Sequence, residues 1–131
     1  MHLPIRTMCI SLGALAAISL APPALAGTNV YAPHYEHGNP SCYQNLRNGG
    51  QFYHSNDTVQ SIDNCADGWG SKIEATIVVT GNTKFCYNIK GSGTSTTCDY
   101  NFVEGRVGML RAWSVDNDIE KGAGDWYAFL T

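Results

Sequence analysis

Histidine, acidic and hydroxyl side chains are the groups in this 131-residue chain that could carry catalysis or bind a metal. His34 and His37 have a His-x-x-His spacing, which would suit two metal ligands on one face of a helix. Pro33 and Gly38 instead predict a loop, and no acidic third ligand follows at a fixed spacing. We therefore interpret these histidines as exposed loop residues and predict no metal site and no cofactor.

Nucleophilic hydrolysis finds little support in the sequence. A G-x-S-x-G motif is missing, and the Gly- and Ser-containing residues 91–95 do not have that order. His54 is the only candidate base beyond the amino-terminal segment. Glu74, Asp99 and Glu104 leave a carboxylate-based glycoside hydrolase open as an alternative, because a sequence does not give the distance between carboxylates.

One acidic segment has the spacing that opens a calcium-binding loop. Asp116, Asp118 and Glu120 stand at the first, third and fifth positions. Such a loop needs glycine sixth and glutamate twelfth, where this chain has Lys121 and Tyr127. We expect a solvated acidic loop, and a looser calcium site stays open.

Residues 31–36 resemble the catalytic stretch of small guanyl-preferring fungal ribonucleases. That resemblance implies a glutamate, an arginine and a second histidine later in the chain. Glu74 and Arg106 could take the first two roles, but no histidine follows Arg106 to act as the general acid. The sequence therefore argues against a ribonuclease.

The amino-terminal residues 1–26 predict a cleaved export signal. A short positive region with Arg6 precedes an apolar stretch over 8–20, and Ala24-Leu25-Ala26 forms an A-x-A cleavage site. The apolar stretch is shorter than the roughly 20 residues that span a bilayer. Loss of Arg6 takes the charge from −3 to −4. We expect a secreted protein that binds neither nucleic acid nor membranes.

Four cysteines remain after Cys9 leaves with the signal, and they predict two disulfides in an oxidising compartment. Three connectivities are possible. We favour Cys42–Cys65 and Cys86–Cys98, because each pair brackets a predicted hairpin. The spacings match no common zinc site.

The mature chain has the pattern of an all-β protein. Turn residues recur every 8–12 positions, and β-branched and aromatic residues dominate between them. We predict a small antiparallel β-sandwich or barrel of about seven short strands over 51–131, a single β domain. Residues 27–50 are polar and rich in turn residues, and predict an irregular amino-terminal arm pinned only by Cys42.

Alternation predicts which strand faces are buried. In one strand Phe85, Tyr87 and Ile89 alternate with Cys86. In another, one face carries Val107, Met109, Trp113 and Val115, and the other carries Gly108, Leu110 and Ala112. The predicted aromatic core is Phe85, Tyr87, Tyr100, Phe102, Trp113 and Phe129. This assignment conflicts with the favoured disulfide, because it places Cys86 on the face opposite to Phe85 and Tyr87.

Other aromatic residues lie in polar or turn-rich segments and predict an exposed binding surface. Its residues are Tyr31, Tyr35, Tyr43, Trp69 and Trp126. We expect a non-catalytic extracellular binding module whose partner is an extracellular protein or a cell-wall polymer. One alternative is a secreted enzyme inhibitor or toxin-like effector that presents the loop over 90–97; another is a small secreted hydrolase.

The chain from about 50 to 130 resembles a group of small exported actinobacterial β-rich disulfide proteins. The motifs that carry the resemblance are mostly turns and cysteines: Asp63-Asn64-Cys65-Ala66-Asp67-Gly68, Cys86-Tyr87-Asn88, Gly91-x-Gly93-Thr94, Cys98-x-Tyr100 and Glu104-Gly105. The resemblance implies export, disulfides and a β-rich fold, and it supplies no catalytic residues.

Overall fold

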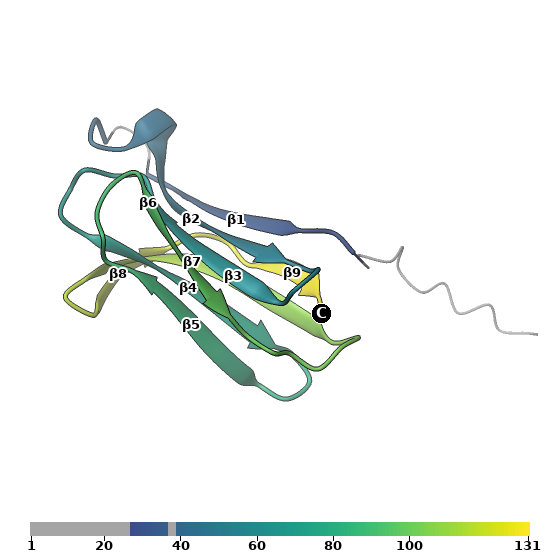
Figure 1. The fold of residues 1–131 in the computed structure, drawn as a ribbon. Coiled ribbons are helices and arrows are strands. Elements are labelled where there is room, and N and C mark those ends of the chain that lie inside the picture. Colours follow the sequence, from purple (N-terminus) through teal and green to yellow (C-terminus); the bar gives the residue numbers. More distant parts are fainter. Residues whose placement is uncertain (1–26, 37–38) are drawn as a thin grey trace, which may run out of the picture.

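Two antiparallel β-sheets pack face to face in the computed structural model, which describes residues 27–36 and 39–131 (Figure 1). The first sheet has the strand order β1-β2-β3-β6; the second has the order β5-β4-β7-β8, and β9 also pairs with β7. The predicted all-β sandwich is confirmed, with nine strands in the described residues instead of about seven. The strands are β1 (Val30–Tyr35), β2 (Leu46–Tyr53), β3 (Thr58–Asp63), β4 (Gly70–Ile77), β5 (Asn82–Asn88), β6 (Thr94–Asp99), β7 (Val107–Asp116), β8 (Ile119–Ala123) and β9 (Tyr127–Leu130).

Strand β7 organises the second sheet. One of its edges pairs with β4, from Gly108 to Val115. Its other edge is shared between β8 and β9, which lie end to end along it. The chain crosses from the first sheet to the second between β3 and β4, returns at β6 and crosses again at β7. Strands β4 and β7 lie in the middle of the second sheet, and their outward side chains therefore have a neighbouring strand on each side.

Both predicted disulfides are present. Cys42 pairs with Cys65 at a Cα–Cα distance of 4.1 Å, and Cys86 pairs with Cys98 at 5.8 Å. The second bridge joins β5 to β6 and therefore ties the two sheets together. Each bridge is expected to stabilise the fold by about 2–4 kcal/mol. Two disulfides suit an oxidising or extracellular environment.

The interior of the sandwich changes in character along the strands. At one end three phenylalanines pack together: the Phe52 and Phe129 ring centroids are 4.2 Å apart, and Phe102 lies 6.1 Å from Phe129. Phe102 and Phe129 are buried, as the sequence predicts. At the other end the buried side chains are polar, and Ser61 Oγ lies 2.7 Å from Ser71 Oγ across the two sheets.

The prediction of an irregular arm over 27–50 is wrong for two stretches of it, because residues 30–35 form β1 and residues 46–50 belong to β2. Ala32 of β1 is fully buried in the core. Pro33 is compatible with this strand because β1 lies at a sheet edge. Gly50, read as part of a turn, instead allows close packing, since a Cβ there would overlap the Ile73 side chain.

The predicted faces of β5 and β7 are inverted. Cys86 is fully buried in order to reach Cys98, so its neighbours Phe85 and Tyr87 point outward and are 44% and 43% exposed. In β7 the alternate residues Gly108, Leu110, Ala112 and Ser114 are buried, whereas Met109 and Trp113 are only partly buried. Val115, on the predicted inward face, is buried. A sandwich interior filled by other strands accepts only small and medium side chains from β5 and β7, which moves their aromatic residues outside.

The predicted export signal over 1–26 and His37 lie outside the described residues. Within the described part of the chain, no helix has the length and apolar character needed to cross a bilayer.

Candidate functional site

Aromatic and cationic side chains cover the outward side of the second sheet. Strand pairing places Lys72 between Tyr87 and Trp113, and places Phe85 and Arg111 on either side of Glu74. Directly paired residues share one face of a sheet, so these side chains form two adjacent rows. We call the following set the ladder: Phe85, Tyr87, Lys72, Trp113, Arg111 and Trp126.

Lys72 lies beneath aromatic rings at the centre of the ladder. The residue is only 3% exposed, although it points away from the sandwich interior. Its Nζ lies 4.8 Å from the Phe85 ring centroid and 4.9 Å from that of Trp113. It also forms an ion pair with Glu120 of β8. Lysine is almost never so buried unless it is paired, and here the rings and a carboxylate together provide the pairing.

Arg111 lies in the second row of the ladder, where it contacts two tryptophan rings. Its Cζ lies 4.2 Å from the Trp113 ring centroid and 4.1 Å from that of Trp126, so the guanidinium contacts both indoles. Glu74 Oε2 accepts hydrogen bonds from Arg111 Nη2 at 3.0 Å and from Trp113 Nε1 at 2.7 Å. Trp113 therefore contacts a cation of each row, Lys72 in one and Arg111 in the other, and its ring orientation is fixed.

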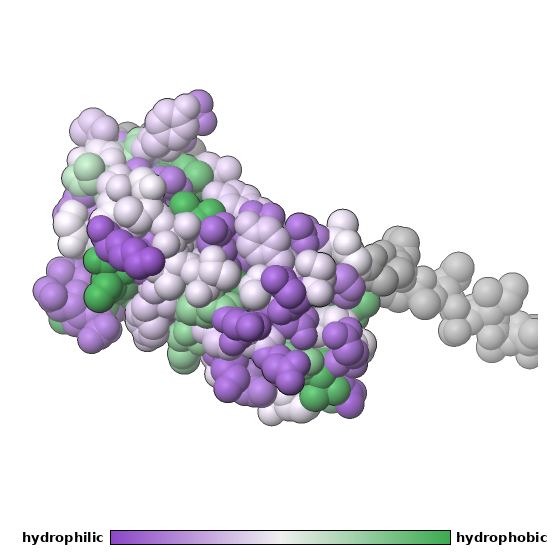
Figure 2. Space-filling view, viewed as in Figure 1, coloured by the Kyte–Doolittle hydropathy of each residue, from purple (hydrophilic) through white to green (hydrophobic). Residues whose placement is uncertain are grey.

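The ladder carries no net charge, because Lys72 is paired with Glu120 and Arg111 with Glu74. Its exposed parts are aromatic: Trp126 is 39% exposed, close to the values of Phe85 and Tyr87. On the side of the molecule seen in Figure 2, hydrophobic residues occur in small groups separated by hydrophilic ones. An uncharged aromatic surface on a rigid sheet is suited to binding.

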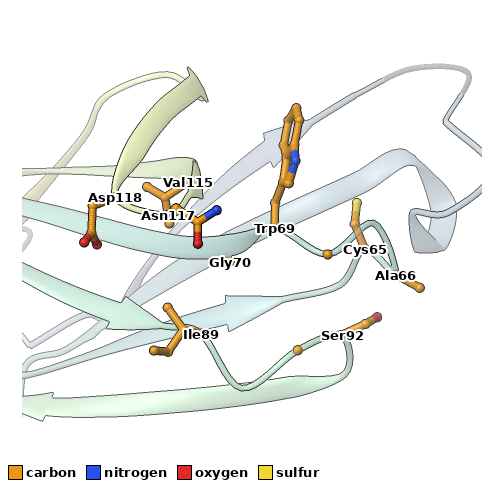
Figure 3. Close-up of a pocket in the computed structure, with 11 residues that line it drawn as sticks. Cys65, Ala66, Trp69, Gly70, Ile89, Ser92, Val115, Asn117 and Asp118 are labelled. Carbon is orange, nitrogen blue, oxygen red and sulfur yellow. The ribbon is translucent and has the colours of Figure 1, made fainter.

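A hollow of about 420 Å³ lies beside the ladder, at the end of β4 (Figure 3). Ile89 lies on one side of Gly70, and Val115, Asn117 and the following turn lie on the other. Trp69 stands up from the segment that leads into Gly70. This volume falls within the range of about 300–1,000 Å³ that is usual for ligand pockets.

A second, smaller hollow of about 210 Å³ lies against Trp69. Here the buried Arg47 guanidinium lies 4.2 Å from the Trp69 ring centroid. Arg47 Nη2 donates to Asp67 Oδ2 at 2.6 Å, and Glu36 also pairs with this arginine. Trp69 lines both hollows and is oriented by the charged group beneath it.

Ser114 joins this cluster to the polar interior. Its Oγ accepts hydrogen bonds from Arg47 Nε at 2.7 Å and from Asn48 Nδ2 at 2.9 Å. Both lone pairs are then used, so its own hydrogen is directed to His34 Nδ1, 3.3 Å away. Burial lowers the pKa of His34, the nearby Asn48 side chain opposes this, and the charge of Arg47 lowers the pKa further. His34 is therefore a half-buried residue of β1, not the exposed loop residue that the sequence predicts.

The five predicted surface residues do not form one surface. Trp126 belongs to the ladder. Trp69 and Tyr35 line the smaller hollow together. Tyr31 lies on β1 with its hydroxyl over Gly49 of the neighbouring strand. Tyr43 is 69% exposed, in the short 3-10 helix η1 (Tyr43–Asn45) beside the first disulfide.

The sequence prediction missed most of the ladder, because Phe85, Tyr87 and Trp113 were assigned to the core. A signal that could have found the first two is the predicted disulfide. A cysteine that links two sheets must face inward, and Phe85 and Tyr87 adjoin Cys86 on either side. No comparable signal marks Lys72, whose hydrophilic character predicts a solvated side chain.

The loop proposed for enzyme inhibition is shorter than expected. Strand β6 begins at Thr94, so the second half of residues 90–97 belongs to a sheet. Asn88 causes this change, because its Nδ2 donates to Thr94 O at 2.9 Å and fixes the start of β6.

In the part of the chain that the structure describes, no group of three or more histidine, cysteine or acidic residues could hold a metal ion. Comparisons with family models, with curated proteins and with solved structures found no match. The resemblance to small exported actinobacterial proteins therefore stays a prediction.

Proposed function

We propose that the protein is a secreted, non-catalytic binding module that holds a cell-wall polymer on the ladder. The single observation that carries this proposal is the outward position of the largest rings of β5 and β7, around a buried Lys72. Export is supported by the predicted signal and by two disulfides, which suit an oxidising compartment.

The physical advantage of this arrangement is preorganisation. Ordering a flexible side chain on binding costs about 0.5–1.5 kcal/mol. In the ladder that ordering takes place on folding, because each cation–π contact contributes about 0.5–2 kcal/mol, depending on desolvation. Trp113, which contacts both Lys72 and Arg111, gains the most. A ligand therefore meets rings that are already in place.

The geometry around Ser114 argues against a serine nucleophile at this position. A serine nucleophile needs a free lone pair to attack, and both lone pairs of Ser114 Oγ accept hydrogen bonds from Arg47 and Asn48. The short loop between β5 and β6 likewise gives less support to an inhibitor that inserts a long loop into an enzyme cleft.

The test is a depletion isotherm on insoluble chitin, cellulose and β-1,3-glucan with the oxidised mature protein. Tyr87→Ala removes an exposed ring of the ladder and should weaken binding about 5- to 30-fold, which corresponds to about 1–2 kcal/mol. Trp126→Ala should have a similar effect, because it removes the ring that covers Arg111.

Tyr43→Ala is the matched control, since it removes an even more exposed tyrosine that lies outside the ladder. It should leave the isotherm unchanged. Equal losses for Tyr87→Ala and Tyr43→Ala would mean that adsorption is nonspecific. Tight polymer binding that survives both ladder substitutions would place the site elsewhere.

A further inference from the structure

The larger hollow continues the ladder along the same three strands. Lys72 of β4 pairs with Tyr87 and with Trp113. Two residues before Lys72, at the start of β4, lies Gly70, which pairs with Val115. Val115 and Gly70 both line the hollow, together with Ile89, two residues beyond Tyr87. A ligand that follows the ladder toward this end of the sheet reaches the hollow directly.

The hollow is closed by walls on the side away from the ladder. Trp69 and Gly68 form one wall where the chain enters β4, and Ser92 lies in the loop after β5 (Figure 3). The turn between β7 and β8, with Asn117 and Asp118, forms another wall. A chain lying on the ladder would therefore meet walls at this end, which suits a terminal unit better than an internal one.

The chemistry of the walls selects the class of ligand. Trp69, Ile89 and Val115 supply apolar surface, whereas Asn117, Asp118 and Ser92 supply hydrogen-bonding groups. The described lining contains no lysine or arginine and one carboxylate, which disfavours an anionic group. A saccharide unit has apolar C–H faces and many hydroxyls, and it matches a mixed lining of this kind.

We infer that the hollow holds the terminal unit of a neutral saccharide chain whose next units lie on the ladder. This inference rests on the proposed function and makes it specific, because it predicts recognition of chain ends.

The decisive experiment varies the number of chain ends at constant polymer mass. Partial acid hydrolysis of the β-1,3-glucan, chitin or cellulose that binds can raise the number of ends tenfold, as measured by reducing-sugar content. Binding capacity per gram should rise about tenfold. A soluble disaccharide of the same polymer should compete with the polymer. Its affinity should be unchanged in Tyr43→Ala, which alters neither the ladder nor the hollow.

Two variants test the hollow itself. Ser92→Tyr places a ring in the hollow and should abolish competition by the disaccharide. Asp118→Asn retains the turn, because asparagine readily adopts the φ of 66° found there. It should weaken disaccharide binding about tenfold through loss of a charge-assisted hydrogen bond. Thermal melts of both variants establish that the fold is intact.

The outcomes separate this inference from the proposed function. A capacity that stays constant as chain ends increase overturns end recognition and leaves the ladder as a site for internal stretches. A protein that adsorbs to none of the three polymers overturns both proposals. Preferential capture of chitosan, with a loss above 100-fold in Asp118→Asn, assigns the hollow to a cationic group and overturns the neutral saccharide.

Discussion

Replacing Asp63 with asparagine should stabilise the protein at neutral pH. Asp63 and Asn48 are paired across β2 and β3, so their side chains lie on the same inward face. Asp63 is 2% exposed and Asn48 is 1% exposed. Asp63 Oδ1 accepts a hydrogen bond from the Cys65 N–H at 3.1 Å, but Asp63 Oδ2 and Asn48 Oδ1 have no partner. Two acceptor oxygens on adjacent buried side chains cannot bond to each other.

The Asp63→Asn change supplies the missing donor. The amide oxygen keeps the bond from Cys65, and the new NH2 group can donate to Asn48 Oδ1. An unsatisfied buried polar atom costs about 1–3 kcal/mol, so the free energy of unfolding should rise by about that amount at pH 7. Loss of attraction to Arg47 opposes this gain, but Asp67 and Glu36 already pair with that arginine.

The pH dependence provides the sharper test. Burial raises the pKa of the Asp63 carboxyl, and the hydrogen bond from Cys65 opposes the rise. A carboxyl with a raised pKa holds its proton more tightly in the folded state. Wild-type stability is therefore lost as the pH rises from about 3.9, the unfolded value, through the folded pKa. The advantage of the asparagine variant should be complete at pH 7 and should shrink below pH 4, where the protonated carboxyl can donate to Asn48.

Urea unfolding at pH 7, 5 and 3.5, followed by tryptophan fluorescence, measures this difference. The carboxyl of Asp57, whose pKa burial also raises, is present in both proteins and cancels in the difference. A variant that is less stable than wild type at pH 7, or one with the same advantage at every pH, would refute the reasoning.

Four further variants test the packing. Phe129→Ala should cost about 3–5 kcal/mol because the ring is fully buried, whereas Phe85→Ala should cost about 1 kcal/mol because its ring lies outside; urea unfolding of both variants distinguishes them. The double substitution Cys86→Ser and Cys98→Ser should lower the free energy of unfolding by about 2–4 kcal/mol, and therefore the melting temperature. Added reductant should then lower the melting temperature of this variant less than that of the wild type, because only the Cys42–Cys65 bridge is left to reduce. Gly108→Ala should destabilise by about 1–3 kcal/mol in the same melts, because a Cβ there would overlap the Phe129 ring.

The fold class and both disulfides could be predicted from the sequence because they depend on local signals. Turn residues mark the ends of strands, and Cys42 and Cys65 flank the β2-β3 hairpin, as the sequence predicts. Cys86 and Cys98 flank one reversal of the chain, but β5 and β6 belong to opposite sheets and do not form the predicted hairpin. Strand faces depend on a non-local question, namely which side of a strand other strands cover. Hydrophobicity alone placed Phe85 and Tyr87 inside, whereas the buried Cys86 between them reports the true face.

The amino-terminal strands were missed for a different reason. Gly49 and Gly50 are typical of a turn, but in β2 they permit contact with Tyr31 on one face and with Ile73 on the other. Pro33 is tolerated because β1 is an edge strand. In each case the residue type is consistent with two structures, and only the neighbouring strand decides between them.

The polar end of the interior and the two hollows lie at the same end of the sandwich, and we interpret this as a division of roles. Phenylalanine packing at the opposite end is nondirectional and supplies stability. Hydrogen bonds are directional. The bond of Ser114 fixes Arg47 in the wall of the smaller hollow, and the bond of Asn88 fixes the end of the loop that lines the larger one. Apolar residues at these positions would favour collapse but would leave the loops without defined partners. The unpaired oxygen of Asp63 is then a local cost of building a precise end from buried polar groups. That interpretation predicts that substitution of Ser114 or Asn88 alters binding more than stability, and that substitutions among the phenylalanines do the reverse.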